Sequence, residues 1–144
     1  MDLTIILLPI HGVDDSSIYS LANEMDVMVE RLGLHLDRDF NIPIKTSWKM
    51  YLFGNEFVSP QLAPAIGVFI QQYQWDYFSF YKIVWEKDRF RYYVAPRIFK
   101  SGTQMHTVDS LMPVDINSLN GVIILNDFLR NLEDVANTGA VSCR

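Results

Sequence analysis

The apolar positions in the first third of the chain predict a strand followed by a helix. Residues 3–9 form a short apolar run that is typical of a buried strand, and turn-forming residues close it at positions 11–15. Apolar residues between Ile18 and Leu32 then recur at the spacing of one helix face, after candidate capping residues at positions 14–17. Gly33 follows the last of them, where a glycine commonly ends a helix. We therefore expect a helix over residues 18–32.

The next stretch predicts a second short helix and a short strand. Residues 45–53 open with a Thr-Ser pair as candidate cap and end before Gly54, a pattern that favours a helix. The prolines at positions 60 and 64 predict a loop. Residues 65–71, which are mostly apolar, then form a candidate strand.

The strongest strand pattern is the aromatic segment Tyr77–Trp85, where β-branched and aromatic residues occupy nearly every position. A polar turn at residues 86–88 separates it from a second such run, Phe90–Ala95, so the two segments predict a β-hairpin. Pro96 has no amide proton to donate to a sheet. We expect the second strand either to lie at an edge there or to be interrupted before residues 97–99.

The C-terminal third supports two interpretations. Residues 119–135 approximate a helical stripe. Asn120-Gly121 is also a turn dipeptide, so residues 122–125 are alternatively a short strand that precedes a helix from Asn126 or Asp127. Together the segments predict one α/β (α+β) domain over residues 1–144.

Length and composition agree with a single domain. The chain has 144 residues, 49% hydrophobic and 20% charged, which is enough apolar material for a sizeable core and too much for a disordered chain. The single cysteine, Cys143, cannot form an intrachain disulfide, which favours a reducing compartment. The apolar run at residues 5–10 is far shorter than the ~20 residues of a membrane span and follows no basic segment. We expect a cytoplasmic protein that does not enter a membrane.

Charge is distributed unevenly along the chain, whose net charge is −5. Residues 1–43 hold eight acids and two bases, residues 44–100 four and eight, and residues 101–144 five and two. The acidic balance disfavours a function that holds many phosphates over the whole surface. Both acidic ends are instead candidates for contact with a cationic partner.

No motif for catalysis or cofactor binding is present. The sequence has neither a G-x-S-x-G motif nor a glycine-rich phosphate loop, and its histidines are not at metal-ligand spacing. His11 with Asp14 and Asp15 is the one cluster to weigh as a metal or hydrolase site, but a helix N-terminus that favours acids explains it more simply. Asp37 and Asp39 fit a solvated loop as well as an acid pair. We expect no enzyme, no cofactor and no metal.

Aromatic and basic residues alternate between positions 77 and 100, the composition of a sheet that stacks the bases of single-stranded nucleic acid. The cations of this segment include Lys82, Arg89, Arg91, Arg97 and Lys100. Core packing is the simpler explanation of the aromatics, and the acidic thirds would have to stay away from the phosphates. A sheet-based single-stranded nucleic-acid-binding protein is therefore the alternative function.

Several structural motifs in the middle of the chain follow a recognisable order and spacing. They are Ser47-Trp48, residues 65–68, the hairpin strand at residues 78–85, residues 92–94 and Ile98-Phe99. In this order, over about residues 44–100, the chain resembles the immunity proteins of bacterial contact-dependent growth inhibition systems. The resemblance implies a small cytosolic α/β protein with a curved, mainly antiparallel sheet around the aromatic hairpin, packed against two or three helices. It also implies a protein without enzymatic activity that neutralises the C-terminal toxin domain, commonly a nuclease, of a delivered surface protein.

A nuclease toxin is basic where it holds phosphates, so an inhibitor can attract it with carboxylates, while one or two aromatic anchors carry most of the binding energy. The candidate anchors are Tyr77 and Tyr81, with Trp85 as a third if its face of the hairpin is open, although core packing is the favoured fate of Trp85. The candidate acids are Asp14, Asp15, Glu24, Asp26, Glu30, Asp37, Asp39, Glu133 and Asp134.

Overall fold

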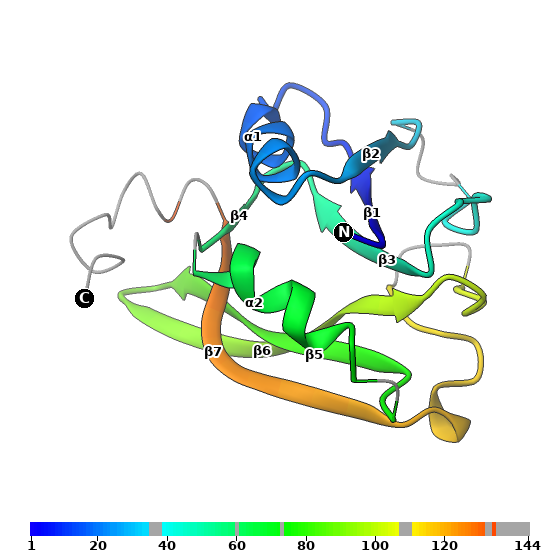
Figure 1. Cartoon of the computed structure of the whole chain (residues 1–144). Helices are drawn as coiled ribbons and strands as arrows, with labels where there is room; N and C mark the ends of the chain where they lie inside the picture. Colours follow the sequence, from blue (N-terminus) through cyan, green and yellow to red (C-terminus); the bar gives the residue numbers. More distant parts are fainter. Residues whose placement is uncertain (35–38, 60, 73, 107–110, 132–133, 135–144) are drawn as a thin grey trace.

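A curled seven-stranded sheet with two helices on its inner side organises the chain (Figure 1). The computed structural model describes residues 1–34, 39–59, 61–72, 74–106, 111–131 and 134. The strands are β1 (Leu3–Leu8), β2 (Met28–Arg31), β3 (Trp48–Phe53), β4 (Glu56–Val58), β5 (Tyr77–Glu86), β6 (Arg89–Lys100) and β7 (Gly121–Asn131). The helices are α1 (Ser16–Met25), α2 (Leu62–Phe69) and the single 3-10 turn η1 (Ile116–Ser118).

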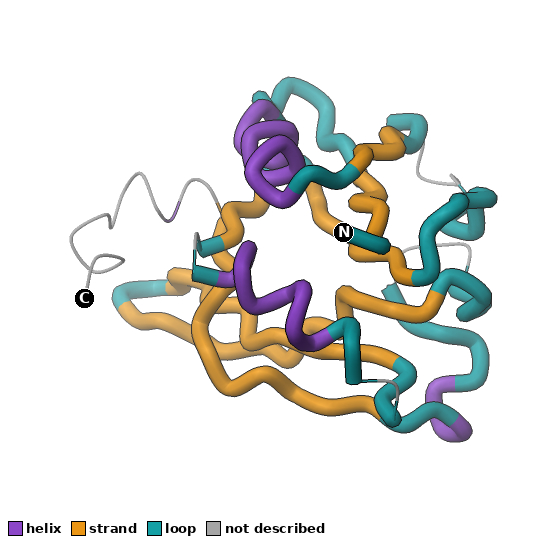
Figure 2. The backbone as a smooth tube through the Cα atoms, in the orientation of Figure 1, coloured by secondary structure: helices purple, strands orange, loops and turns teal. Residues whose placement is uncertain are grey.

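The strands lie in the order β2-β1-β3-β6-β5-β7-β4. The pairs β3–β6, β5–β6 and β4–β7 are antiparallel, whereas β1–β2, β1–β3 and β5–β7 are parallel. The predicted fold class is thus confirmed, including the aromatic hairpin β5–β6 at the centre, and the antiparallel pairs make up half of a mixed sheet. Figure 2 shows how far strand exceeds helix in the backbone.

The connection from β3 to β4 forces the sheet to curl. Only Gly54 and Asn55 separate these strands along the chain, yet β6, β5 and β7 lie between them in the sheet. Four strand spacings in a flat sheet would span about 19 Å. The three residue steps from Phe53 to Glu56, when fully extended, reach only about 10 Å. The sheet therefore bends until β7, drawn in orange in Figure 1, brings β4 back towards the end of β3.

Each face of the sheet carries its own core. The inner face packs against α1 and α2 through a large cluster that includes Ile5, Met50, Phe78 and Ile98. The outer face is covered over β1 and β3 by the segments around Phe40 and Met105 and holds a smaller cluster; its buried strand residues are Ile6, Leu8, Tyr51 and Phe99. Because both faces of β1 and β3 are covered, neither strand shows an alternating sequence pattern.

Two predicted elements are of the wrong type. One is a strand whose two faces are both buried, and the other is a helix that contains a proline. Residues 45–53 were expected to be helical, but residues 48–53 form β3, in which even Lys49 is buried. Residues 65–71 were expected to be a strand, but α2 spans Leu62–Phe69. Pro64 falls in the first turn of α2, where proline needs no hydrogen-bond partner, so it does not mark a loop.

The first helix is shorter than predicted. It ends at Met25 because Asp26 takes a left-handed conformation, with φ 54° and ψ 52°. Residues 28–31 then form β2, which pairs in parallel with the confirmed first strand β1. At the C-terminal end, β7 is a strand over Gly121–Asn131, so the single-helix interpretation of this region is wrong. The alternative is right about the strand at residues 122–125 but wrong about a helix from Asn126 or Asp127, because the strand continues to Asn131.

Pro96 lies at a β-bulge. Phe78 pairs with Ile98 and Ser79 with Pro96, so Arg97 is an extra residue on β6. The strand is therefore neither interrupted nor at an edge of the sheet, since a bulge is a third place where a sheet tolerates proline. Bulges redirect side chains. Here the bulge turns the Arg97 guanidinium towards Glu56.

Glu56 is the hub of a buried ion network at the start of β4. Its side chain has 0% exposure, and its two oxygens accept hydrogen bonds from Arg97 at 2.5 and 2.8 Å. Lys82 Nζ lies 2.6 Å away, and the Phe53 amide donates to the same carboxylate at 2.7 Å. Burial alone would raise the pKa of Glu56, but Arg97 and Lys82 outweigh it and hold the pKa below 4.5.

Replacing Arg97 with Met leaves Glu56 buried beside Lys82 alone. We expect Arg97→Met to lower the free energy of unfolding by about 3–5 kcal/mol, since removing one partner leaves a buried charge without that compensation. Arg91→Met is the matched control, because Arg91 also lies on β6 but pairs with Glu86 at the surface, where an ion pair contributes less than about 1 kcal/mol. Urea unfolding followed by circular dichroism measures both, and equal losses would contradict the assigned role.

Lys49 is a second buried charge, and it lacks a carboxylate partner among the contacts of its ammonium group in the structure described. Its Nζ donates to the Thr103 carbonyl at 2.7 Å and lies 5.6 Å from the centre of the Tyr51 ring. Burial lowers the pKa of Lys49 from 10.5 to about 8. Below that pH both folded and unfolded chains hold the proton, and the folded state carries the full burial penalty.

We expect the free energy of unfolding to rise between pH 8 and pH 9.5, because there the unfolded chain binds the Lys49 proton and the folded chain releases it. This window lies below the ordinary tyrosine pKa of 10.0. Lys49→Met should flatten the rise and increase stability at pH 7, whereas Lys45→Met, at an exposed lysine nearby, should change neither. Urea titrations at pH 7, 8, 9 and 9.5 measure this; an unaltered slope in Lys49→Met refutes it.

Candidate functional site

Four of the predicted acids lie exposed on α1, β2 and the segments beside them, at the top of Figure 1. We call this group the acidic α1–β2 surface; it comprises Asp14, Glu24, Asp26 and Glu30. Asp15 beside it is half-buried, with its carboxylate 3.7 Å from Nε of Arg31. Arg31 is the only Lys or Arg in the first 34 residues, so the surface is strongly negative.

Two of these acids stand where they weaken the helix. Glu24 lies in the last turn of α1 and Asp26 is its C-cap, with no basic residue in that turn. The C-terminal end of a helix carries partial negative charge, so acids there are destabilising. Asp26 also holds a positive φ, a conformation that Asp and Asn adopt more readily than other non-glycine residues. The charge of the helix end, however, does not explain why it carries two carboxylates, and residues that break local rules commonly serve a function.

A large apolar side chain sits among the acids. Met28 is 69% exposed and shares a face of β2 with Glu30, while Val29 between them packs on the inner core. Strand β2 is also an edge of the sheet. The surface thus combines carboxylates with one adaptable apolar contact.

The two predicted tyrosines lie elsewhere, on the outer face of β5–β7. Tyr77 stacks on Phe99 with ring centres 5.9 Å apart and fills the space over Gly121, where a Cβ would come within 2.1 Å of the Tyr77 ring. Tyr81 packs edge-on against Tyr92 at 6.3 Å. The candidate anchors are therefore on a different part of the molecule from the acidic α1–β2 surface (Figure 1).

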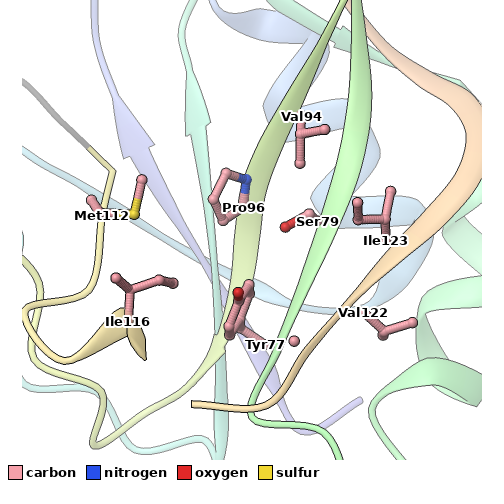
Figure 3. Close-up of a pocket in the computed structure, with 9 residues that line it drawn as sticks. Tyr77, Ser79, Val94, Pro96, Met112, Ile116, Val122 and Ile123 are labelled. Atoms are coloured by element: carbon pink, nitrogen blue, oxygen red, sulfur yellow. The ribbon is translucent and has the colours of Figure 1, made fainter. Parts of the chain in front are cut away.

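Beside Tyr77 the outer face is hollowed. The hollow has a volume of about 420 Å³, and Figure 3 shows Met112 and Ile116 approaching Pro96 from the loop side, with Ser79, Val94 and Ile123 on the strands. The side chains that line it are apolar apart from the hydroxyls of Ser79 and Tyr77. No sequence pattern indicates this hollow, because it arises where β5, β6, β7 and the segment at residues 111–116 meet.

The remaining predicted acids are dispersed. Asp37 and Glu133 lie outside the described residues. Asp39 is exposed and accepts a hydrogen bond from the Asn41 amide at 2.8 Å. Asp134 is only 8% exposed and accepts a hydrogen bond from the Trp85 amide at 3.1 Å, so its carboxylate serves the fold.

The cations of residues 77–100 are mostly engaged within the protein. Lys82 and Arg97 hold Glu56, Lys100 lies 3.1 Å from Asp76, and Arg91 lies 3.0 Å from Glu86. Exposed aromatics do remain near the hairpin turn, among them Trp85, Tyr92 and Tyr93. A phosphate backbone would therefore have to compete with carboxylates for most of the positive charge.

The residues around His11 do not converge on a site. Hydrogen bonds from the Ser16 amide and hydroxyl hold the pKa of Asp14 below its ordinary value, as in a turn that precedes a helix. Among the described residues, no group of three or more His, Cys, Asp or Glu side chains is arranged to hold a metal ion. Nor is any described helix both long and apolar enough to cross a membrane.

Comparison with known proteins found no family model that matches the chain and no curated protein with significant similarity to it.

Reversing the charge at the end of α1 tests whether the acids there are a structural burden. We expect Glu24→Lys to raise the free energy of unfolding by about 0.3–1 kcal/mol, because a cation suits the helix C-terminus. Asp14→Asn should have the opposite sign, since it weakens the bonds to Ser16 at the other end. Thermal unfolding of both variants measures the difference. A loss of stability in Glu24→Lys would mean that Glu24 is there for the fold.

Proposed function

We propose that this chain is a non-enzymatic, cytoplasmic immunity protein that binds and neutralises the toxin domain of a contact-dependent growth inhibition protein. The observation that carries the proposal is the acidic α1–β2 surface, where Glu24 and Asp26 are kept at a helix end that they destabilise. The resemblance of residues 44–100 supplies the class of partner.

The binding mode follows from the charges. A nuclease domain presents lysines and arginines to phosphates, and the carboxylates of the acidic α1–β2 surface offer them substitute oxygen ligands. Long-range attraction speeds the encounter, and Met28 provides the apolar contact that slows dissociation. Occupation of the basic site by protein excludes the nucleic acid, so no bond-breaking chemistry is required of this chain.

Co-expression tests the proposal in cells. We expect this chain to protect bacteria that express the basic toxin domain encoded next to it, and Glu24→Gln/Glu30→Gln to protect less. The control Asp88→Asn/Asp115→Asn removes the same amount of charge at exposed positions away from the surface and should protect fully. Undiminished killing despite soluble expression of the wild-type chain refutes the proposal.

Binding kinetics with the purified toxin domain give the magnitude. The Glu24→Gln/Glu30→Gln variant should associate about tenfold more slowly at low salt and lose part of its salt dependence. Anisotropy with labelled single-stranded DNA and RNA completes the test: micromolar binding that weakens steeply with salt would favour the nucleic-acid alternative instead.

A further inference from the structure

The hollow on the outer face of β5–β7 has a polar floor. Ser79 lies on β5 between Tyr77 and Tyr81, whose side chains share its face of the sheet. Across the sheet it pairs with Pro96 of β6 and with Ile123 of β7. A small side chain with larger ones on all four sides leaves a recess above it. The Ser79 hydroxyl therefore lies at the bottom of the hollow.

The walls of the hollow are apolar and come from three parts of the chain. Val94 and Pro96 lie on β6 and Ile123 on β7, while Met112 and Ile116 approach from the loop side (Figure 3). No charged side chain is among the described residues that line it. An ion would lose its water there without gaining an opposite charge, so the hollow favours an uncharged occupant.

Two hydroxyl groups face this apolar space. Ser79 is only 2% exposed, and its oxygen points into the hollow in Figure 3. Within the part of the chain that the structure describes, neither this hydroxyl nor that of Tyr77 takes part in a hydrogen bond. A hydroxyl so far from bulk water is costly unless something in the hollow bonds to it. Both groups are thus available to a polar atom of a bound molecule.

The size of the hollow fits a small molecule. Its volume of about 420 Å³ lies in the range of small-molecule sites, about 300–1,000 Å³. At about 30 Å³ for a water-sized group, it has room for roughly fourteen of them. A partner protein would close over the rim and reach the Ser79 hydroxyl with one side chain at most, whereas a small molecule contacts the walls and the floor together.

The Tyr77 ring and the Met112 thioether are favourable neighbours for an aromatic ring. We propose that the hollow binds an uncharged aromatic molecule that carries a carbonyl or hydroxyl group, whose oxygen bonds to the hydroxyls of Ser79 and Tyr77. This site is separate from the acidic α1–β2 surface, and the proposal does not rest on the immunity function.

Two probes of equal size test the chemistry. 2-Acetylnaphthalene is uncharged and carries one carbonyl, whereas 2-naphthoate has as many non-hydrogen atoms and a negative charge. In NMR titrations we expect 2-acetylnaphthalene to shift the amides of Ser79, Val94 and Ile123 with a dissociation constant of about 1 mM or tighter. The naphthoate should bind at least about tenfold more weakly. Unshifted amides at the solubility limit of 2-acetylnaphthalene, or equal affinity for both probes, overturn the proposal.

Variants of the floor test the hydroxyl. Ser79→Ala should weaken the binding of 2-acetylnaphthalene about three- to tenfold. Ser79→Val, which fills the floor and suits a strand, should abolish it, and circular dichroism checks that this variant folds. Ser17→Ala is the matched control, because the Ser17 hydroxyl is also buried without a partner among the described residues but lies on α1, at the inner face of the sheet. Equal losses in Ser79→Ala and Ser17→Ala contradict the proposed site.

Stability gives a readout without any ligand. Because the Ser79 hydroxyl has no partner among the described residues, Ser79→Ala should keep or raise the urea midpoint of the free protein. A clear fall would show that the fold itself uses the hydroxyl, and the proposal would fail.

Two further titrations identify other occupants. Adding the purified toxin domain, or raising the concentration of the chain itself, should leave the amides of Ser79 and Ile123 unshifted. Shifts of these amides together with displacement of 2-acetylnaphthalene would assign the hollow to a protein contact and overturn the proposal.

Discussion

The ion network around Glu56 is the constraint on which the curled sheet depends. Glu56 begins β4, which must return to the neighbourhood of β3 after three intervening strands, and its carboxylate binds β5 through Lys82 and β6 through Arg97. The same group accepts the Phe53 amide at the end of β3. A hydrophobic residue could fill the volume, but it could not fix the register of four strands at one point. This ion network also accounts for the bulge at Pro96, which directs the Arg97 guanidinium to the Glu56 carboxylate.

The curl also determines which surfaces are left for other molecules. Helices α1 and α2 cover the inner face, and the segments around Phe40 and Met105 cover the outer face only over β1 and β3. The outer face of β5–β7 is left partly open, which creates the hollow. Acidic residues occupy the exposed side of α1 and β2. One sheet thus offers an acidic surface and a largely apolar hollow at separate places.

Sequence patterns predict those parts of this fold that are decided locally. Strand β1 and the hairpin β5–β6 follow from apolar runs and a polar turn, and the acids of α1 and β2 were visible as a charge imbalance. The identity of β3 was not visible, because burial of both faces erases the alternation and even places a lysine inside. Likewise the end of α1 depends on a left-handed Asp26, and α2 on a proline in its first turn. The Glu56 network and the hollow join residues that are far apart in sequence, and no single segment encodes them.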